Sequence, residues 1–295
     1  MNNLLQLLVN GLIAGSAYAL AAIGYAMVYS ILKFVNFANG SLAMVGGYLA
    51  FVCLTQLGLP LPVAVVASLL GTALLGVIID KVAYRPLRTA PKIICLVTAM
   101  AASFIISAVV LLWMGAEWKQ FPFPVVQGIQ IGPISITGVQ LGMIGTTLFF
   151  LAALLLLLNQ TRIGKQIRAV ADNAELASIN GINSETTISV VFGVGSALAA
   201  VAGILIGINT LLTPSMGFDL TMAGWAACVL GGMGSIQGAI VGGFVMGMAE
   251  NLGVWYIFGG DARWKLTISY MLMMIILVFK PSGLLGRKED AMVFA

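Results

Sequence analysis

The chain has 295 residues, of which 60% are hydrophobic and 8% charged; it contains no histidine and has a formal net charge of +4. A mean hydropathy of +1.06 excludes a soluble globular domain. Apolar runs of about 20 residues, the length of a membrane-crossing helix, recur from end to end. The composition therefore predicts an all-α integral membrane protein, a polytopic helix bundle of eight to nine crossings with broken helices, in one domain over residues 1–295.

The first half of the chain predicts four crossings. The second of them is interrupted by the polar segment Asn36–Gly40. The predicted spans cover residues 4–32, 34–57, 63–79 and 93–114. Residues 115–138 have little charge, with Pro122 and Pro124 among them, so we expect an external loop that lies on the membrane.

The second half predicts spans at residues 139–158, 187–208, 221–249 and 265–279. Residues 220–249 contain no charge and as one helix would be about 45 Å long. Their middle is the glycine-rich segment Gly231–Ser235, which we expect to break the helix into two short crossings. This break gives nine crossings, of which eight are obvious from hydropathy.

Orientation follows from the basic residues. If the C-terminal tail lies on the same side of the membrane as the basic loops, most of the 14 Lys and Arg residues fall on that side. By the positive-inside rule that side is cytoplasmic. We therefore expect Lys33, the loops at 81–92 and 162–168, and the tail with Lys280, Arg287 and Lys288 to be cytoplasmic, and the N-terminus to be periplasmic. The same bias accounts for the basic charge without a nucleic-acid partner.

Residues for catalysis are scarce. No span contains paired carboxylates, and Gly164-Lys165-Gln166 fails the phosphate-loop pattern. We expect no catalytic residue, no metal and no cofactor. Asp219 and Glu250 are the ionisable residues nearest to the hydrophobic spans, and we place both near span ends. Coupling to an ion gradient is therefore disfavoured, and energy must enter elsewhere.

Small residues recur four positions apart, a spacing that lets helix backbones approach closely in lipid. The pairs are Gly11 with Gly15, Gly203 with Gly207, Gly238 with Gly242, and Gly243 with Gly247. We interpret them as packing within the chain or against another subunit.

The polar interruption at residues 36–41 has two interpretations. Asn36 and Asn39 are costly in hydrocarbon, so they should face protein or a water-filled path. The segment is either an ordinary helix end beside Lys33 or part of the lining of a path. A weak internal echo pairs residues 37–47 with residues 218–232, as in transporters built from inverted repeats.

The most polar stretch is residues 159–186, with long uncharged sequence on both sides. Asp172 and Glu175 have the spacing of a capping box, and Gly181 suits the left-handed position that ends a helix. This pattern predicts a helix of about two turns in a cytoplasmic loop.

These residues resemble a known family. Glu175-Leu176-Ala177, followed after three residues by Gly181, is similar to the loop with which permeases of ATP-binding cassette importers dock into their ATPase. Further ordered motifs resemble the inner-membrane permeases of high-affinity branched-chain amino acid uptake systems. They are Tyr18–Tyr25, Val35–Gly40, Val82–Arg88, Arg162–Gly164 with Gly181–Asn183, and Val229–Ser235. Asn39 stands where that family commonly has histidine, which leaves its role open.

The resemblance implies a permease in a bacterial inner membrane that translocates leucine, isoleucine, valine or related neutral amino acids. It implies four kinds of contact: a second, related permease subunit in a heterodimer, two cytoplasmic ATP-binding subunits, a periplasmic binding protein and the lipid membrane. Permeases for urea or short amides look similar, and a passive channel for a small neutral solute would also lack buried charge. Nothing in the sequence identifies the solute or the residues that touch it.

Two sets of site residues follow from the resemblance. The ATPase-coupling loop comprises Arg162, Gly164, Lys165, Arg168, Asp172, Glu175, Ala177 and Gly181. The translocation path comprises Tyr18, Tyr25, Asn36, Asn39, Gly40, Ser41, Phe218, Gly231, Gly232 and Gly234.

Overall fold

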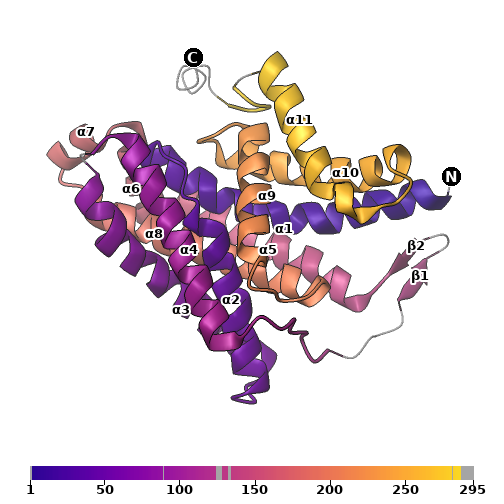
Figure 1. Cartoon of the computed structure of the whole chain (residues 1–295). Helices are drawn as coiled ribbons and strands as arrows, with labels where there is room; N and C mark the ends of the chain where they lie inside the picture. The colour runs from indigo at the N-terminus through magenta and orange to yellow at the C-terminus, as the bar shows by residue number, and fades with distance from the viewer. Residues whose placement is uncertain (1, 89, 124–127, 132–133, 281, 287–295) are drawn as a thin grey trace.

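The structure, a computed structural model, describes residues 2–88, 90–123, 128–131, 134–280 and 282–286 (Figure 1). These residues form a helical bundle with one small hairpin, which confirms the predicted fold class. In chain order the elements are α1 (Asn2–Leu32), α2 (Ala38–Thr55), α3 (Leu61–Ile79), η1 (Asp80–Tyr84), η2 (Arg85–Leu87), α4 (Lys92–Met114), β1 (Ile129–Ile131), β2 (Ile134–Ile136), α5 (Gly138–Gln160), α6 (Arg162–Asp172), α7 (Ala174–Ile179), α8 (Ser184–Asn209), α9 (Met216–Gly231), α10 (Ile236–Ile257), η3 (Ala262–Trp264) and α11 (Lys265–Phe279).

Seven helices in the described part of the chain are long and apolar enough to cross a membrane. They are α1, α2, α3 with its continuation to Leu87, α4, α5, α8 and α10. The helices α9 and α11 are apolar but have only 16 and 15 residues, about 24 and 22 Å at the α-helical rise. A multi-pass membrane protein is therefore confirmed, and the count of nine crossings stays a prediction.

The predicted break in the long uncharged segment is confirmed. The helix α9 ends at Gly231 and α10 begins at Ile236. Between them Gly232 and Gly234 have φ angles of +112° and +86°, which side chains other than glycine rarely adopt. Ser235 then caps α10, because its hydroxyl accepts a hydrogen bond from the backbone of Gly238 at 3.0 Å.

The loop at residues 115–138, which we expected to lie on the membrane, differs from the expectation, because part of it forms an antiparallel hairpin. In β1 and β2 isoleucines alternate with polar residues, the period-two pattern of a strand. The side chain of Gln6 in α1 anchors β2 through hydrogen bonds of 2.8 and 3.1 Å to the backbone of Ser135. Pro124 lies outside the described residues.

Close helix packing without side chains holds α1 against α10. Gly11 and Gly15 face Gly247 and Gly243 across this contact, and a Cβ at Gly15 would lie 2.8 Å from the Cα of Phe244. The other predicted pairs also pack within the chain: Gly203 meets Ala43, Gly207 meets Leu212, and Gly238 and Gly242 meet α9. The interpretation as packing within the chain is confirmed.

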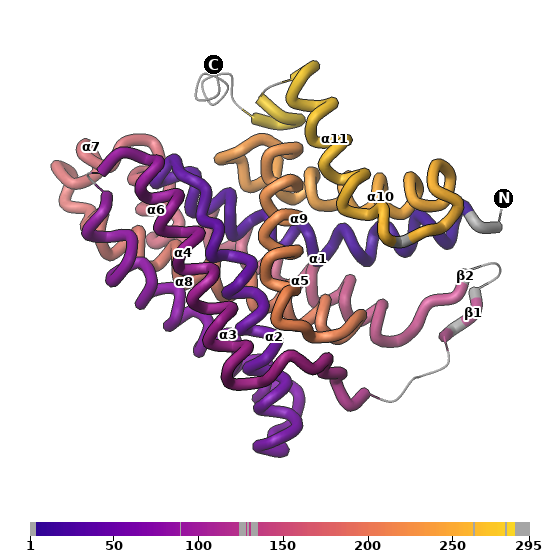
Figure 2. Tube along the Cα trace, in the orientation of Figure 1, coloured from indigo at the N-terminus to yellow at the C-terminus, as the bar shows by residue number. Residues whose placement is uncertain are grey.

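The two ends of the molecule differ. Helices α6 and α7 lie at one end, and the hairpin and the beginning of α1 lie at the other, as Figures 1 and 2 show. Ion pairs join Glu185, at the start of α8, to Arg85 and Arg88 in the turn before α4. These two predicted basic loops therefore share one end, as the distribution of Lys and Arg indicated. Arg287 and Lys288 lie outside the described residues.

Candidate coupling loop and translocation path

The loop at residues 159–186 contains two helices where the sequence predicted one. The additional helix is α6, and Thr161 caps it by accepting a hydrogen bond from the backbone N–H of Gly164 at 3.1 Å. A Cβ at Gly164 would collide with the backbone of Leu157 and Leu158. Glycine at this position therefore lets α6 turn back tightly against the end of α5.

The helix α6 has one buried and one exposed face. Ile167 and Val170 are buried against the bundle, whereas Arg162, Lys165 and Arg168 are exposed. An amphipathic helix at the end of a membrane bundle lies with its apolar side on the bundle. The three predicted basic residues consequently lie on the face of α6 that points away from the bundle.

The ends of α7 correct one part of the expected capping. The cap is Asn173, whose Oδ1 accepts hydrogen bonds from the backbone of Glu175 and Leu176 at 2.9 and 3.0 Å. Asp172 is instead the last residue of α6. Because Asn173 has an extended backbone and Asp172 a helical one, only Asn173 can reach the free N–H groups of α7.

The C-terminal end of α7 is as predicted. Gly181 has a φ of +81°, and the backbone of Ile182 donates to the carbonyl of Ala177 at 3.0 Å. Together with the bond from Gly181 to Ser178, this is a Schellman motif. A Cβ at Gly181 would meet nothing within 4 Å, so the requirement for glycine comes from the backbone alone.

The outer face of α7 is exposed and partly apolar. Ala177 points inward and is 4% exposed, whereas Leu176 and Ile179 are 57% and 77% exposed. A depression of about 330 Å³ lies beside them, and it is lined by Ala169, Asp172, Asn173, Leu176, Ala177, Asn180 and Ile182. Apolar side chains on a polar loop outside the bundle are typical of a surface that binds another protein.

The polar interruption is a genuine break between α1 and α2. Asn36 and Asn39 are each 2% exposed, so they face protein as expected. Asn36 Oδ1 accepts hydrogen bonds from the hydroxyl of Tyr84 at 2.6 Å and from the backbone of Ala38 at 3.2 Å. Asn39 Nδ2 donates to the carbonyl of Ala21 at 3.2 Å. The break therefore joins α1, α2 and η1.

The beginning of α2 also packs closely on the beginning of α9. A Cβ at Gly40 would collide with Gly217 and Thr221, and Thr221 Oγ1 donates to the carbonyl of Phe37 at 3.2 Å. On the other side Ser41 Oγ lies 2.7 Å from Ser103 Oγ of α4. Two predicted path segments far apart in sequence thus meet where both helices begin.

Nine of the ten predicted path residues fall into three groups. Tyr25, Asn36, Asn39, Gly40 and Ser41 surround the break, with Tyr25 against Gly224 of α9. The glycines at 231, 232 and 234 lie elsewhere, at the other end of α9. There the backbone N–H groups of Leu284 and Leu285 donate hydrogen bonds to the carbonyls of Leu230 and Gly231.

The third group corrects the expected place of Glu250. This residue lies inside α10 and is 1% exposed, so it is buried rather than near a helix end. Its carboxylate accepts hydrogen bonds from the hydroxyl of Tyr18 at 2.9 Å and from that of Ser269. Tyr18 thus belongs to this contact, and Phe218 is 52% exposed, outside all three groups.

Sequence reasoning missed a second buried carboxylate, that of Asp80, which is fully buried where η1 continues α3. Its signal was a single acidic residue at the end of an apolar run, followed within ten positions by two arginines. Such a spacing predicts an ion pair only if the chain turns back, which it does after η2.

Known proteins resemble the chain over nearly its full length. A family described as "Branched-chain amino acid transport system / permease component" matches residues 7–277. The high-affinity branched-chain amino acid transport system permease protein BraD of Pseudomonas aeruginosa is 38% identical, over 97% of this chain and 96% of its own. The corresponding protein LivH of Escherichia coli K12 is 35% identical with the same two coverages, 97% and 96%. The autoinducer 2 import system permease protein LsrC of Escherichia coli is 29% identical, over 77% of this chain and 65% of its own.

Proposed function

The chain belongs to the family of permease components of branched-chain amino acid transport systems, and from this premise we propose that it is the membrane-spanning subunit of an ATP-binding cassette importer. Its solute is leucine, isoleucine, valine or a related neutral amino acid. The observation that supports this mechanism best is α7, a short helix capped at both ends whose exposed outer face includes Leu176 and Ile179.

The partners follow from what the chain provides. It offers a docking surface at α7, and its Gly164-Lys165-Gln166 segment fails the phosphate-loop pattern. ATP hydrolysis therefore takes place on separate subunits, which bind the loop at residues 159–186. Two such ATPases drive the change in access, a second, related permease completes the path, and a periplasmic binding protein delivers the solute. Arg162, Lys165 and Arg168 flank α7 and are exposed, so they are available to acidic residues of the ATPase.

The proposed orientation places α7 in the cytoplasm and the hairpin and N-terminus in the periplasm of a bacterial inner membrane. The C-terminus is then cytoplasmic. A reporter fused at Ala295 that is active only in the cytoplasm tests this, and activity of a periplasmic reporter at the same position would contradict it.

The decisive experiment replaces Gly181 with Val and, separately, Glu175 with Lys. Valine at a left-handed position costs about 1–2 kcal/mol of backbone strain, which distorts the end of α7. Lysine reverses a charge on its outer face. Both variants should insert normally, lose ATP-dependent leucine uptake and bind the ATPase less tightly in a pull-down from detergent.

A matched control is Gly145→Val, because a Cβ at Gly145 in α5 also meets nothing within 4 Å and its backbone is ordinary helix. Unchanged uptake and ATPase binding in both test variants would refute docking at α7. Leucine entry into liposomes that contain the permease without ATPase would identify a passive channel instead. Urea or short amides bound by the cognate binding protein in place of leucine would move the solute to that class.

A further inference from the structure

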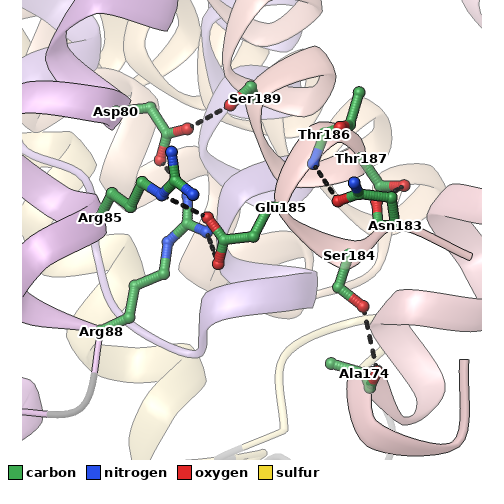
Figure 3. Close-up of polar contacts among 10 residues, drawn as sticks. All are labelled: Asp80, Arg85, Arg88, Ala174, Asn183, Ser184, Glu185, Thr186, Thr187 and Ser189. Carbon is green, nitrogen blue, oxygen red and sulfur yellow. Dashed lines mark hydrogen bonds and ion pairs between the residues drawn. The ribbon is translucent and has the colours of Figure 1, made fainter. Parts of the chain in front are cut away.

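A network of charged and polar side chains begins at the C-terminal end of the loop at residues 159–186. Glu185, in the first turn of α8, contacts Arg85 Nε at 2.8 Å and Arg88 Nη1 at 2.7 Å. Figure 3 shows the Glu185 carboxylate facing both guanidinium groups. Beside it, the hydroxyl of Ser184 donates to the carbonyl of Ala174 in α7 at 3.0 Å. The coupling helix and the turn before α4 are therefore joined through adjacent residues of α8.

The network continues into the interior through Asp80. Arg88 Nη2 lies 2.5 Å from Asp80 Oδ1, and Ser189 Oγ of α8 donates to Asp80 Oδ2 at 2.7 Å (Figure 3). Asp80 is fully buried and the Arg88 side chain is 14% exposed. Both carboxylate oxygens thus have a partner, one from the turn and one from α8.

From Asp80 the network continues through η1 to the break before α2. Asp80 is the first residue of the π-helical turn η1 and Tyr84 is the last. Tyr84 is 1% exposed, stacks on Phe192 of α8 with ring centroids 5.3 Å apart, and donates its hydroxyl to Asn36 at 2.6 Å. Asn36 in turn accepts from the first backbone N–H of α2. An uninterrupted set of contacts therefore runs from α7 to the beginning of α2.

The energetics favour a positioning role over a purely stabilising one. A buried ion pair stabilises a fold no more, and often less, than a well-packed apolar pair, because the desolvation of both charges offsets their attraction. It does fix geometry, since each carboxylate oxygen must meet a particular donor. A π-helical turn is itself a local departure from α-helix that is often found at functional sites.

We propose that Asp80, Arg88 and Glu185 are positioning residues that couple movement of α7 to the beginning of α2 through Tyr84 and Asn36. The proposal rests on the proposed docking function of α7. When the ATPase displaces α7, Glu185 moves with the start of α8 and pulls on the two arginines. Asp80 and the π-helical turn transmit this shift to Asn36, where α2 packs against α9.

The test uses the complete importer in proteoliposomes with leucine as the probe, and measures leucine transported per ATP hydrolysed. The variants are Asp80→Asn, Glu185→Gln and Tyr84→Phe, which keep the size of each side chain and remove one charge or one hydroxyl. Each should lower the transport ratio at least about fivefold, the lower range of a coupling between sites, while ATPase binding stays normal. The control is Arg263→Gln, which removes an exposed ion pair with Asp261 in the loop before α11 and should leave the ratio unchanged.

A double variant separates coupling from simple destabilisation. If Asp80 and Glu185 act in one series of contacts, Asp80→Asn with Glu185→Gln should be no worse than the more severe single variant. Thermal unfolding of each variant detects loss of the fold. If Asp80→Asn does not fold, Tyr84→Phe still tests the proposal, because it keeps the buried ring and removes only the hydroxyl. A normal transport ratio in Glu185→Gln and Tyr84→Phe overturns the proposal. The proposal is also overturned if the double variant lowers the transport ratio by the product of the two single-variant effects. Either result leaves docking at α7 intact, whereas unchanged uptake and ATPase binding in both Gly181→Val and Glu175→Lys would refute docking itself.

Discussion

The contact between α1 and α10 allows a sharp test of glycine packing. Membrane helices have no hydrophobic driving force toward each other, so close backbone approach supplies much of their attraction. A Cβ added at Gly15 would lie 2.8 Å from Phe244 Cα and 3.1 Å from the carbonyl oxygen of Gly243, where ordinary contacts begin at 3.4 Å. The obstacle is backbone on the facing helix, so no side-chain rotation can relieve it.

Gly15→Ala therefore forces the two helices apart by about 0.6 Å, the difference between 3.4 and 2.8 Å. Inserting one carbon into a closely packed contact costs about 1–3 kcal/mol, which is about a 5- to 150-fold change in the equilibrium of unfolding. Reversible denaturation in mixed micelles, followed by tryptophan fluorescence, measures this difference.

The matched control is Gly142→Ala, because Gly142 is an exposed glycine of α5 whose added Cβ meets nothing within 4 Å. We expect it to raise the free energy of unfolding by up to about 1 kcal/mol, because alanine has a higher helix propensity than glycine. If Gly15→Ala is as stable as the parent protein, or if both variants lose stability equally, the close approach of α1 and α10 does not contribute as inferred.

Two further predictions concern polar contacts. Asn173→Ala removes the side-chain cap of α7 and should destabilise that helix by about 1 kcal/mol. We expect weaker ATPase binding with an unchanged unfolding midpoint of the whole protein. Unaltered ATPase binding would count against this prediction. Glu250→Leu removes the acceptor for the buried Tyr18 hydroxyl and should lower stability by about 1–3 kcal/mol, measured by thermal unfolding. Glu250→Gln retains one acceptor oxygen and should lose less; an equal loss would show that charge, not hydrogen bonding, matters there.

Hydropathy and local backbone chemistry were sufficient to predict several features of the fold. Apolar runs of crossing length predicted the helices, and the glycines at 231, 232 and 234 predicted the break that separates α9 from α10. Gly181 likewise predicted the end of α7. Each of these depends on a few consecutive residues, so no distant contact was needed.

The N-terminal cap of α7 was beyond such reasoning. Asp172 and Asn173 are neighbours with similar preference for the capping position. What decided between them is where α6 ends, and α6 ends where its buried residues Ile167 and Val170 finish packing on the bundle. The hairpin at residues 129–136 was missed for a similar reason, since its short strands are anchored by Gln6 of α1.

The sequence by itself determined that this protein is a helical membrane protein, where its helices break, and which loop is the most polar, because length, hydropathy and glycine are local properties. Only the tertiary structure decided which polar residues meet. Its long helices are apolar on nearly all sides, so no periodicity marks which face is buried and which meets lipid. Asp80 finds Ser189 across 109 positions of sequence, and Glu250 finds Tyr18 across 232. Such pairs exist only once the helices have packed.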